Sequence, residues 1–381
     1  MFFGALVHAW RCFFRSPPKI LKAGDRVLVV KLSALGDTLL LLPVFKSIKQ
    51  KVGPQGRLFM IATSVNQAAL EKFPFVDEVL IVDFFRIFKN PFALLKFLAQ
   101  LRAFKPKLAL DFDQWLRISP ILCFISGAPR LLGFRTAHQY RHALFHQSVP
   151  NQKGEHESEQ FAKIAQLAGV QRESIEAYNG FLEREGLFKG PATDKTAVVK
   201  KTRIHFHPGC GSYGRLRAWP EEYYAKLAQS LAVTQDVLIQ ITGMGSYEEN
   251  LVRDIIRQSG IDIQDHSGRL EITELADLLR KADLVVCGNT GVMHLATGLG
   301  KALVVTNGPA DPVKWGPSLP ESNSVKKTGM GEVKVLSANL LCSPCTTLGF
   351  EYGCPFRCCM ESIEVKTVLK ECLDLLKTAR G

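Results

Sequence analysis

The chain has 381 residues, of which 46% are hydrophobic and 22% are charged. This composition is that of a globular protein, and the length favours two domains and excludes a small scaffold held by disulfides. Residues 1–150 contain 21 Lys and Arg against 8 Asp and Glu, a balance of +13, whereas residues 151–381 balance at −1. A one-sided basic charge predicts an anionic partner for the first half, either a membrane or a phosphorylated substrate. Nucleic acid ranks last because no nucleic-acid-binding module is recognisable.

Residues 1–22 begin with an apolar stretch, FFGALVHAWRCFF, that is interrupted by His8 and Arg11. About 20 apolar residues are needed to span a bilayer, so we expect an interfacial helix here and not a transmembrane one. The alternative is a terminal helix that docks on the protein. The ten cysteines and the lack of an evident secretion signal favour reduced thiols and a cytoplasmic location, peripheral on the inner face of the cytoplasmic membrane.

The stretch Val27–Pro43, VLVVKLSALGDTLLLLP, predicts a buried parallel strand, a short loop and a helix. Ligands of open α/β sheets bind beyond the carboxyl ends of the strands, so Asp37 in this loop is a candidate functional residue. The alternative is that Asp37 caps the helix. The loop is neither a dinucleotide fingerprint nor a P-loop, because it has one Gly and lacks Gly-Lys-Ser/Thr.

The rest of the first half alternates strands with helices, which predicts parallel α/β units. The expected strands are residues 57–63, 78–82 and 107–112, and the expected helices are residues 65–73, 91–104, 115–125 and 155–168. Residues 133–146 have no clean period and contain Arg135, Arg141 and three His. They predict a cationic loop, which is either a solvated surface segment or a contact for anionic groups of an acceptor.

Residues 183–202 are rich in charge, Gly and Pro and predict the domain boundary. A strand over residues 202–207 then leads into PGCGSYGRLRAWP, with three Gly, Ser212, Arg215 and Arg217. A Gly-rich loop with Arg before a helix suits a diphosphate, although an ordinary long loop is the alternative. Further strands are expected over residues 236–242, 263–267 and 303–306, with helices over residues 271–281 and 363–376.

The stretch DLVVCGNTGVMHLATGLG, residues 283–300, predicts a buried strand followed by a helix that begins near Thr290. Backbone N–H groups at that helix start and the Thr290 hydroxyl predict a second anion site. Near the end of the chain, Cys342, Cys345, Cys354 and Cys358 have the spacing C-x2-C-x8-C-x3-C. This spacing could bind a structural Zn²⁺, but its second half is tighter than in common zinc modules, so a structural loop without metal is favoured.

Four stretches occur in an order that resembles glycosyltransferase family 9, the ADP-heptose:lipopolysaccharide heptosyltransferases and their relatives. They are KLSALGD, the loop that ends in RAWP, NTGVMHLA, and the NGPADP loop, and the resemblance runs from about Val27 to Leu376. Three positions differ from the family pattern: Asn289 stands where the family has Asp, Ala310 where it has Thr, and Arg217 where many members have Lys.

The resemblance implies an α/β fold of the GT-B type, with two Rossmann-like domains whose parallel sheets face a central cleft. We expect residues 23–185 to form the acceptor domain and residues 200–360 the nucleotide-sugar domain. Residues 361–381 are expected to form a helix that packs back on the first domain.

The function that this resemblance implies is inverting transfer of a heptose from a nucleotide sugar, ADP-heptose, to a lipid-linked acceptor of the lipopolysaccharide core. Asp37 would be the general base. The expected donor contacts are Ser212, Arg217, Glu248, Leu270, Asn289, Thr290, Gly291 and His294. The expected acceptor contacts are Lys31, Arg135 and Arg141. No cofactor or catalytic metal is expected. Two alternatives stay open, a non-catalytic protein that binds a nucleotide sugar or lipid, and a GT-B epimerase.

Overall fold

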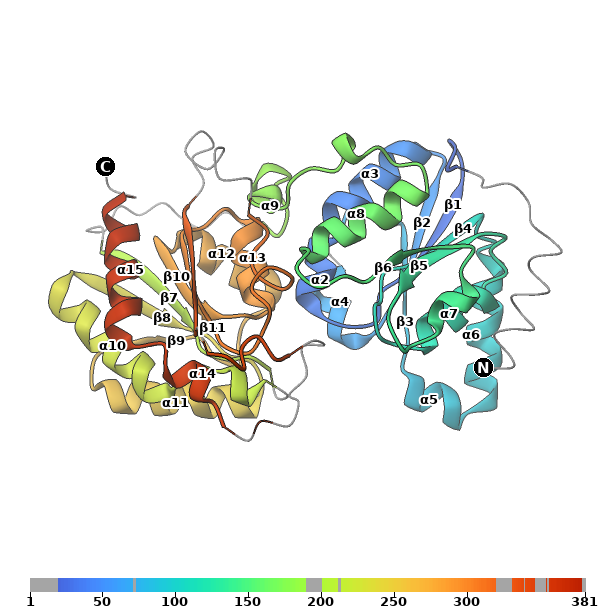
Figure 1. Cartoon of the computed structure of the whole chain (residues 1–381). Helices are drawn as coiled ribbons and strands as arrows, with labels where there is room; N and C mark the ends of the chain where they lie inside the picture. Colours follow the sequence, from blue (N-terminus) through green and yellow to red (C-terminus); the bar gives the residue numbers. More distant parts are fainter. Residues whose placement is uncertain are drawn as a thin grey trace. The chain divides into compact units, whose positions relative to one another are not determined.

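The computed structural model describes residues 20–70, 73–189, 201–211, 214–319, 331–338, 340–346, 354 and 356–378. The chain divides into two compact units, residues 1–176 (unit 1) and residues 177–381 (unit 2), each of which is a sheet covered by helices (Figure 1). None of the helices in the described ranges is long and apolar enough to cross a membrane.

Unit 1 contains a six-stranded sheet in the order β3-β2-β1-β4-β5-β6, with every pair of neighbours parallel. The strands are β1 Arg26–Val30, β2 Arg57–Ala62, β3 Glu78–Ile81, β4 Leu108–Asp111, β5 Leu131–Arg135 and β6 Gln147–Pro150. This is the strand order of a Rossmann sheet: the second and third strands extend to one side of β1, and the fourth to sixth strands extend to the other side. The order of the strands therefore reverses between β1 and β4. Ligands bind beyond the carboxyl ends of the strands at that reversal, which here lies between β1 and β4.

The helices of unit 1 connect successive strands. They are α2 Leu35–Leu40, α3 Leu42–Val52, α4 Ser64–Leu70, α5 Phe84–Lys89, α6 Pro91–Ala103, α7 Ile118–Ile125 and α8 Glu157–Leu167, with 3₁₀ turns η1 Arg141–Leu144 and η2 Arg172–Ser174. The central strand β1 is fully buried over residues 27–30, where it pairs with β2 and β4 on its two sides. A continuous apolar run is what a strand covered on both faces requires, which explains the VLVV signature.

Unit 2 repeats the same topology, with a parallel sheet in the order β12-β11-β10-β7-β8-β9. Its strands are β7 Thr202–His207, β8 Val237–Ile241, β9 Gln264–Asp265, β10 Leu284–Gly288, β11 Leu303–Asn307 and β12 Val333–Ser337. Its helices are α9 Phe181–Arg184, α10 Glu221–Thr234, α11 Ser246–Ser259, α12 Ile272–Lys281, α13 Gly291–Gly298, α14 Cys358–Glu361 and α15 Val365–Thr378, with the 3₁₀ turn η3 Arg215–Arg217. The reversal of strand order falls between β7 and β10.

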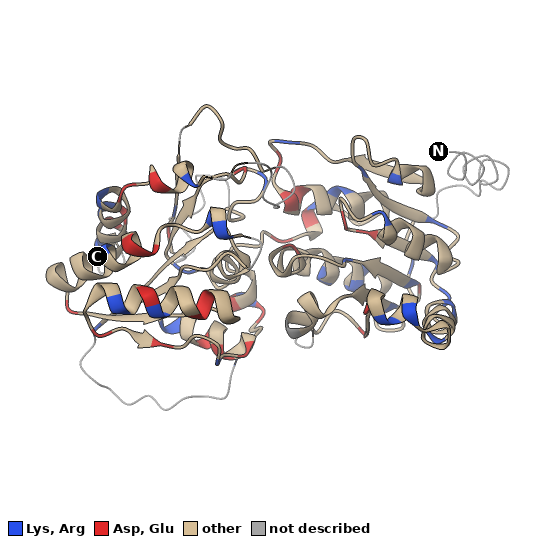
Figure 2. Cartoon of the chain, turned by 90° about the horizontal axis from the view of Figure 1, so that it is seen from below, with Lys and Arg blue, Asp and Glu red and all other residues tan. Residues whose placement is uncertain are grey.

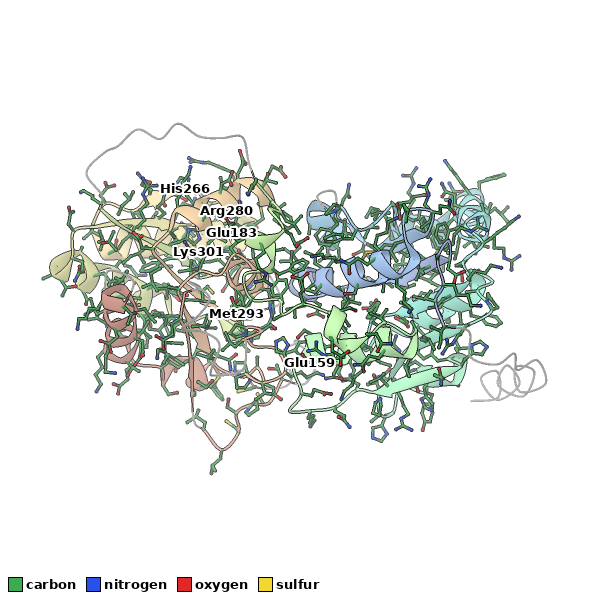
Figure 3. The ribbon with its side chains drawn as sticks, turned by 90° about the horizontal axis from the view of Figure 1, so that it is seen from above. Glu159, Glu183, His266, Arg280, Met293 and Lys301 are labelled. Carbon is green, nitrogen blue, oxygen red and sulfur yellow. The ribbon has the colours of Figure 1, made fainter. Side chains whose placement is uncertain are left out.

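The expected domain limits differ from the structure in two places. The division between the units falls at residue 176, before the predicted boundary at 185–200. Residues 177–189 pack with unit 2, where Arg280 on α12 donates to Glu183 and to the carbonyl of Phe188 (Figure 3). The charge and Gly content of residues 183–202 predicted a boundary between domains. Composition alone could not show that residues 177–189 pack with unit 2.

The closing helix also differs from its expected place. The buried side chains of α15, Val368, Cys372, Leu375 and Leu376, belong to the core cluster of unit 2, and α15 lies against α10 and β11 (Figure 1). The indole N–H of Trp219 donates to the carbonyl of Ile363 at 2.8 Å, which fixes the entry to this helix. The helix is therefore part of the unit 2 core, and its amphipathic pattern does not by itself say against which domain it packs.

Candidate active site

The loop after β1 places Asp37 at the reversal point of unit 1. Asp37 is the third residue of α2, whose N-cap is Ala34 with no side-chain cap bond. Asp37 is therefore not the cap, and its side chain is 10% exposed. Ala34 has a φ of 66°, an uncommon conformation for a residue with a Cβ, which suggests a functional constraint on this turn.

Lys31 holds one oxygen of Asp37. Its Nζ donates to Asp37 Oδ2 at 2.9 Å and lies 3.8 Å from Asp113 Oδ1, and the residue is fully buried. Burial alone would lower the pKa of Lys31, but attraction to Asp37, Asp113 and Glu157 outweighs it and the pKa of Lys31 is raised. Lys31 is therefore a permanent buried cation between carboxylates, and the expected direct contact of Lys31 with an acceptor does not fit this geometry.

Asp113, which follows β4, secures the same loop from the other side of the reversal point. Its Oδ2 accepts the N–H of Leu32 at 2.6 Å and its Oδ1 accepts the Ser33 hydroxyl at 3.0 Å. The next residue, Gln114, donates to the buried carboxylate of Glu157 on α8. The loops after β1 and β4 are thus joined by a charged network that fixes the Asp37 carboxylate.

Arg141 and Arg135 have different surroundings. The Arg141 guanidinium is 3% exposed and donates to Asp111 Oδ2 at 2.6 Å, so it stabilises the interior of unit 1 and is not placed for an acceptor. Burial raises the pKa of Asp111 to about 6, with Arg141 acting in the opposite direction. Arg135 is exposed at the carboxyl end of β5, where its predicted contact with an anionic acceptor is compatible with its position.

In unit 2, Glu248 joins two Gly-rich loops at the carboxyl edge of the sheet. Its Oε1 accepts the N–H of Gly211 at 2.7 Å and its Oε2 accepts the N–H of Met244 at 2.8 Å. A Cβ on Gly209 would lie 2.1 Å from the Glu248 carboxyl carbon, so this glycine lets the carboxylate approach the loop. Of the two adjacent glutamates the sequence favoured Glu248 as a donor contact, and Glu248 is the one whose carboxylate holds this loop.

The arginines of this loop are held by short-range contacts. Arg217 Nη2 donates to the carbonyl of Cys210 at 3.4 Å, and the Arg217 side chain is half-buried with no partner for its Nε among the described atoms. Arg215 lies over the Tyr247 ring at 4.6 Å from the centroid. Ser212, predicted as a donor contact, lies outside the described residues.

Asn289 follows β10 and uses its amide group inside the unit. Its Nδ2 donates to Asn307 Oδ1 at 3.1 Å and to the carbonyl of Trp315 at 3.0 Å. The loop after β10 is therefore tied to the loop after β11. An aspartate could not make either bond, because a carboxylate only accepts. The hydrogen bond to Asn307 therefore gives a structural reason for an Asn at position 289.

The remaining predicted donor residues lie on neighbouring loops of the same edge. Thr290 is the N-cap of α13, and its hydroxyl accepts the N–H of Met293 at 3.5 Å. Gly291 is the first residue of that helix, and His294 is 5% exposed on it. Leu270 is half-buried after β9, in a turn whose Gly268 N–H donates to the carbonyl of Gly243. All these loops follow parallel strands, so unit 2 gathers them at one edge.

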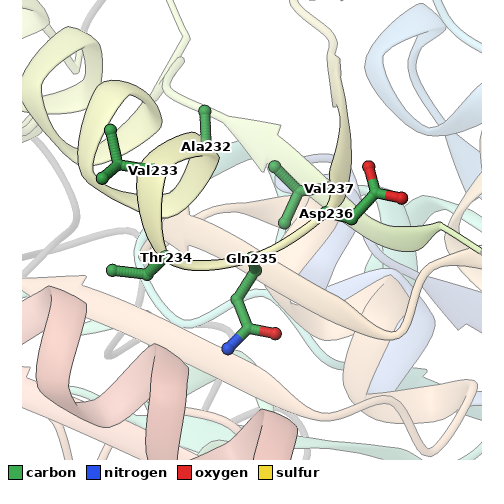
Figure 4. Close-up of a pocket in the computed structure, with 6 residues that line it drawn as sticks. All are labelled: Ala232, Val233, Thr234, Gln235, Asp236 and Val237. Carbon is green, nitrogen blue, oxygen red and sulfur yellow. The ribbon is translucent and has the colours of Figure 1, made fainter.

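Two other features do not form sites. Cys342, Cys345, Cys354 and Cys358 are exposed free thiols, and the described residues contain no group of three or more His, Cys, Asp or Glu arranged to hold a metal ion. The described residues thus give no support to the zinc alternative, and the structural loop without metal stays a prediction. A hollow of about 460 Å³ is lined by residues 232–237, the turn between α10 and β8 (Figure 4). It precedes β8 and so lies at the amino edge of the sheet, away from the loops above.

Sequence analysis missed Asp113, Gln114 and Glu157. The signal for Asp113 was present, because KLALDFD is a buried strand that ends in carboxylates, as the Val27–Asp37 unit does. What the sequence lacked was the strand order, which puts β4 beside β1. Glu157 lies at the start of α8, where acidic residues are common, and nothing local separates a buried carboxylate from a solvated one.

This chain is similar in sequence to one family of enzymes and to several of its curated members. The model of glycosyltransferase family 9 (heptosyltransferase) matches residues 94–339. Lipooligosaccharide heptosyltransferase 2 of Campylobacter jejuni is 25% identical over 184 residues, which are 47% of this chain and 52% of that protein. The enzyme of the same name from Haemophilus influenzae is 29% identical over 145 residues, 36% of this chain and 40% of its own. The matched stretch thus spans about half the length of the curated relatives.

Solved structures show the same fold over nearly the whole chain. The ADP-heptose lipopolysaccharide heptosyltransferase II of Escherichia coli superposes with a TM-score of 0.66 at 17% identity, covering 93% of this chain and 100% of that one. A family 9 glycosyltransferase from Veillonella parvula gives a TM-score of 0.69 at 18% identity, with 95% and 100% covered. The α/β fold is therefore of the GT-B type. Since the family model covers more than half of the sequence, this chain belongs to glycosyltransferase family 9.

Proposed function

We propose that this protein transfers a heptose, with inversion, from ADP-heptose to a lipid-linked acceptor of the lipopolysaccharide core. The observation that carries the proposal is Asp37, a carboxylate held by a buried lysine at the reversal point of a Rossmann sheet. Family membership supports the reaction class, because the curated relatives are lipooligosaccharide heptosyltransferases.

Asp37 would act as the general base of the reaction. Lys31 occupies Oδ2, which leaves Oδ1 to accept the proton of the acceptor hydroxyl as its oxygen attacks the anomeric carbon of the donor. The bond from that carbon to the diphosphate oxygen breaks at the same time, and the nucleoside diphosphate leaves with the negative charge. The hydrogen bonds from Leu32 and Ser33 to Asp113 would keep this turn in place during the reaction.

The loops of unit 2 would bind the donor. The leaving diphosphate needs positive charge and backbone N–H groups, which Arg217 and the N-terminal turn of α13 at Thr290 and Gly291 can supply. The adenosine would lie toward Glu248 and Leu270. The choice of donor rests on a structural neighbour, the E. coli heptosyltransferase WaaC solved with ADP-2-deoxy-2-fluoro heptose, which has a TM-score of 0.64 at 18% identity.

The second candidate is a protein that holds a nucleotide sugar without turnover, and Asn289 is the feature that favours it. The structure gives Asn289 a structural partner in Asn307, so the departure from the family residue has an explanation that does not require loss of catalysis. We therefore rank the transferase first.

The deciding experiment measures nucleotide release from ADP-, GDP- and UDP-sugars with a lipid A-core acceptor, for the wild type and Asp37→Asn. We expect release from ADP-heptose by the wild type, and a loss of at least about 10²-fold in turnover for Asp37→Asn with donor binding retained, because general-base removal has this effect. If Asp37→Asn kept more than a tenth of the turnover, Asp37 would not be the base. Donor binding without any release would favour the binding protein.

A further inference from the structure

The helix pair α5–α6 exposes four large apolar side chains. Phe85, Phe88, Phe92 and Leu95 are 70%, 67%, 81% and 62% exposed, and we call these four residues the α5–α6 face. Single exposed apolar residues are ordinary on protein surfaces, but four within eleven residues on two consecutive helices form a patch, and such patches mark interaction sites.

The four side chains of this face lie outside the hydrophobic core of unit 1. The opposite sides of α5 and α6 carry Phe84, Ile87, Phe97, Leu98 and Leu101, which all pack in or against the hydrophobic cluster on β1 and β2. Both helices are capped, since Asp83 accepts the N–H of Arg86, and Asn90 accepts the N–H groups of Phe92 and Ala93. The exposed phenylalanines are therefore presented on a fixed structure, and Phe88 in addition stacks on Phe84, with the ring centroids 6.1 Å apart.

Basic residues border the face, and acidic residues are absent from it. Residues 84–110 contain six Lys and Arg and no Asp or Glu. Arg86, Lys89 and Lys96 are exposed, and Lys89 Nζ lies 3.8 Å from the centroid of the Phe85 ring. Figure 2 shows Lys and Arg in blue along the ribbon of unit 1. The partner must accept both aromatic side chains and positive charge.

An anionic bilayer satisfies both requirements. Aromatic side chains enter the interfacial region of a bilayer, and Lys and Arg beside them attract anionic headgroups. A second copy of the chain fits poorly, because a two-fold contact through this face would bring Arg86, Lys89 and Lys96 against their own equivalents. Charge complementarity therefore favours a membrane over self-association.

We infer that the α5–α6 face inserts Phe85, Phe88, Phe92 and Leu95 into the headgroup region of an anionic membrane and docks unit 1 there. The inference rests on the proposed function only in the choice of a lipid-borne acceptor. Only two residues separate the end of β3 from the start of α5, so the face lies at the carboxyl edge of the sheet, where α5 projects (Figure 1). The loops that carry Asp37 and Asp113 lie at the same edge, because all strands are parallel. Docking would thus bring the acceptor-side catalytic loops to the membrane surface.

The test uses the full chain and two double variants with the same change in charge. Phe88→Glu/Phe92→Glu places two carboxylates in the face, and Ala232→Glu/Val233→Glu places two on exposed positions of α10 in unit 2. We measure co-flotation with vesicles of phosphatidylethanolamine and phosphatidylglycerol at low salt, and folding by thermal unfolding. We expect the first variant to partition at least about tenfold less than the wild type, because apolar burial is lost and charge is added. The α10 variant should bind as the wild type does.

A third variant separates the electrostatic part from the apolar part. Arg86→Gln/Lys89→Gln keeps the phenylalanines and removes two cations. It should bind anionic vesicles more weakly while its binding to neutral phosphatidylcholine vesicles stays unchanged, because only the attraction to headgroup charge is lost. Equal vesicle binding by Phe88→Glu/Phe92→Glu and the wild type would overturn the inference.

Two other outcomes would overturn the membrane inference and identify another role for the face, and a third would refute only the proposed function. If the wild type forms dimers in sedimentation experiments and Phe88→Glu/Phe92→Glu is monomeric with unchanged vesicle binding, the face is a contact between copies. If this variant loses transfer to a short soluble acceptor, the face belongs to the acceptor site itself. A wild type that transfers no sugar from any donor but still shows the vesicle contrast would refute the proposed function and leave the docking surface intact.

Discussion

At the scale of single residues, Lys31 is the cation on which the Asp37 site depends. Lys31→Met should destabilise unit 1 by about 3–5 kcal/mol, because it leaves buried carboxylates without their partner. Turnover should also fall in whatever fraction folds, because Asp37 Oδ2 loses the donor that holds it in place. Urea unfolding and the kcat of the folded fraction measure the two effects.

The control for this change is Lys46→Met. Lys46 forms an ion pair with Glu176 but is 21% exposed, so its removal should cost less than about 1 kcal/mol and leave kcat unchanged. If both variants behaved alike, the buried lysine would have no special effect on Asp37 and its role would be packing.

Asn289 gives a second prediction at this scale. Asn289→Asp removes the donors to Asn307 Oδ1 and to the Trp315 carbonyl and brings a carboxylate toward both oxygens. We expect a loss of about 1–3 kcal/mol in stability, as for a broken pair of partly buried hydrogen bonds. Thermal unfolding of Asn289→Asp beside Asn289→Ala checks it, and an unchanged melting temperature for Asn289→Asp would mean that the loop can rearrange.

The identity of the site residues could be predicted from sequence only where the partners were local. Asp37 followed from the strand–loop–helix pattern around it. Its contact with Lys31 and the support from Asp113 depend on the order of strands in the sheet, which no local pattern contains. Arg141 illustrates the opposite error, because a cationic stretch suggests an exposed contact whereas this guanidinium is paired with Asp111 in the interior.

At the scale of elements, α11 supports the Gly-rich loop through Glu248. Glu248→Gln keeps the shape of the side chain but replaces an accepting oxygen with a donor, so one of the N–H groups of Gly211 and Met244 loses its partner. ADP should then bind several-fold more weakly, and stability should fall by about 1.5–3 kcal/mol. Glu249→Gln on the same helix turn is the matched control, and equal ADP affinities in calorimetry for both variants would exclude the loop contact.

The buried histidines of strand β7 should make the folding stability of unit 2 depend on pH. Burial, with smaller contributions from His207 and His266, lowers the pKa of His205 from 6.5 to about 3, and His205 shares the Thr242 hydroxyl with His207. His205 is neutral in the folded state and takes up a proton on unfolding below pH 6.5. Stability should therefore fall by about 1.4 kcal/mol per pH unit between 6.5 and 3 for this group.

His205→Gln removes this proton uptake and should flatten the dependence. The measurement is the free energy of urea unfolding of unit 2 between pH 7 and pH 5 for both proteins. Other titrating groups cancel in the difference between the two slopes, so parallel curves would show that His205 is protonated in the folded state as well.

Most elements could be predicted because their patterns are strong, and the missed ones have a physical explanation. Strand β7 has the predicted bounds, and α6 begins at the predicted proline. Helix α5 was not predicted, because its six residues are too few to show a period and bury no side chain. Strand β12 was missed because VKVLS is half-buried throughout, at the edge of its sheet.

At the scale of the whole molecule, the excess of positive charge in residues 1–150 and the α5–α6 face would give unit 1 two kinds of attraction to a membrane. The apolar N-terminal stretch would be a third, and its residues 1–19 lie outside the described structure. Deleting this stretch would test its contribution, and the described residues show where the deletion should end. Leu21 is 4% exposed, and its N–H donates to the carbonyl of Ala168 at 3.0 Å, so Leu21 belongs to the fold of unit 1 and the segment is best removed after residue 19.

The deletion of residues 1–19 should weaken binding to anionic vesicles but not abolish it. At low salt the remaining cations attract the headgroups, and about 1 kcal/mol per basic residue near the surface is enough for several of them to hold the protein. High salt screens this attraction over a Debye length of a few ångströms, whereas burial of the phenylalanines on α5 and α6 persists. The truncated protein should therefore keep a salt-resistant fraction on the vesicles, and Phe88→Glu/Phe92→Glu in the truncated chain should remove that fraction. Complete release of the truncated wild-type sequence by salt would show instead that the N-terminal stretch is the only apolar anchor. Transfer to a short soluble acceptor should persist in the truncated chain, because the described partners that hold the Asp37 loop, Lys31 and Asp113, lie outside the deleted residues.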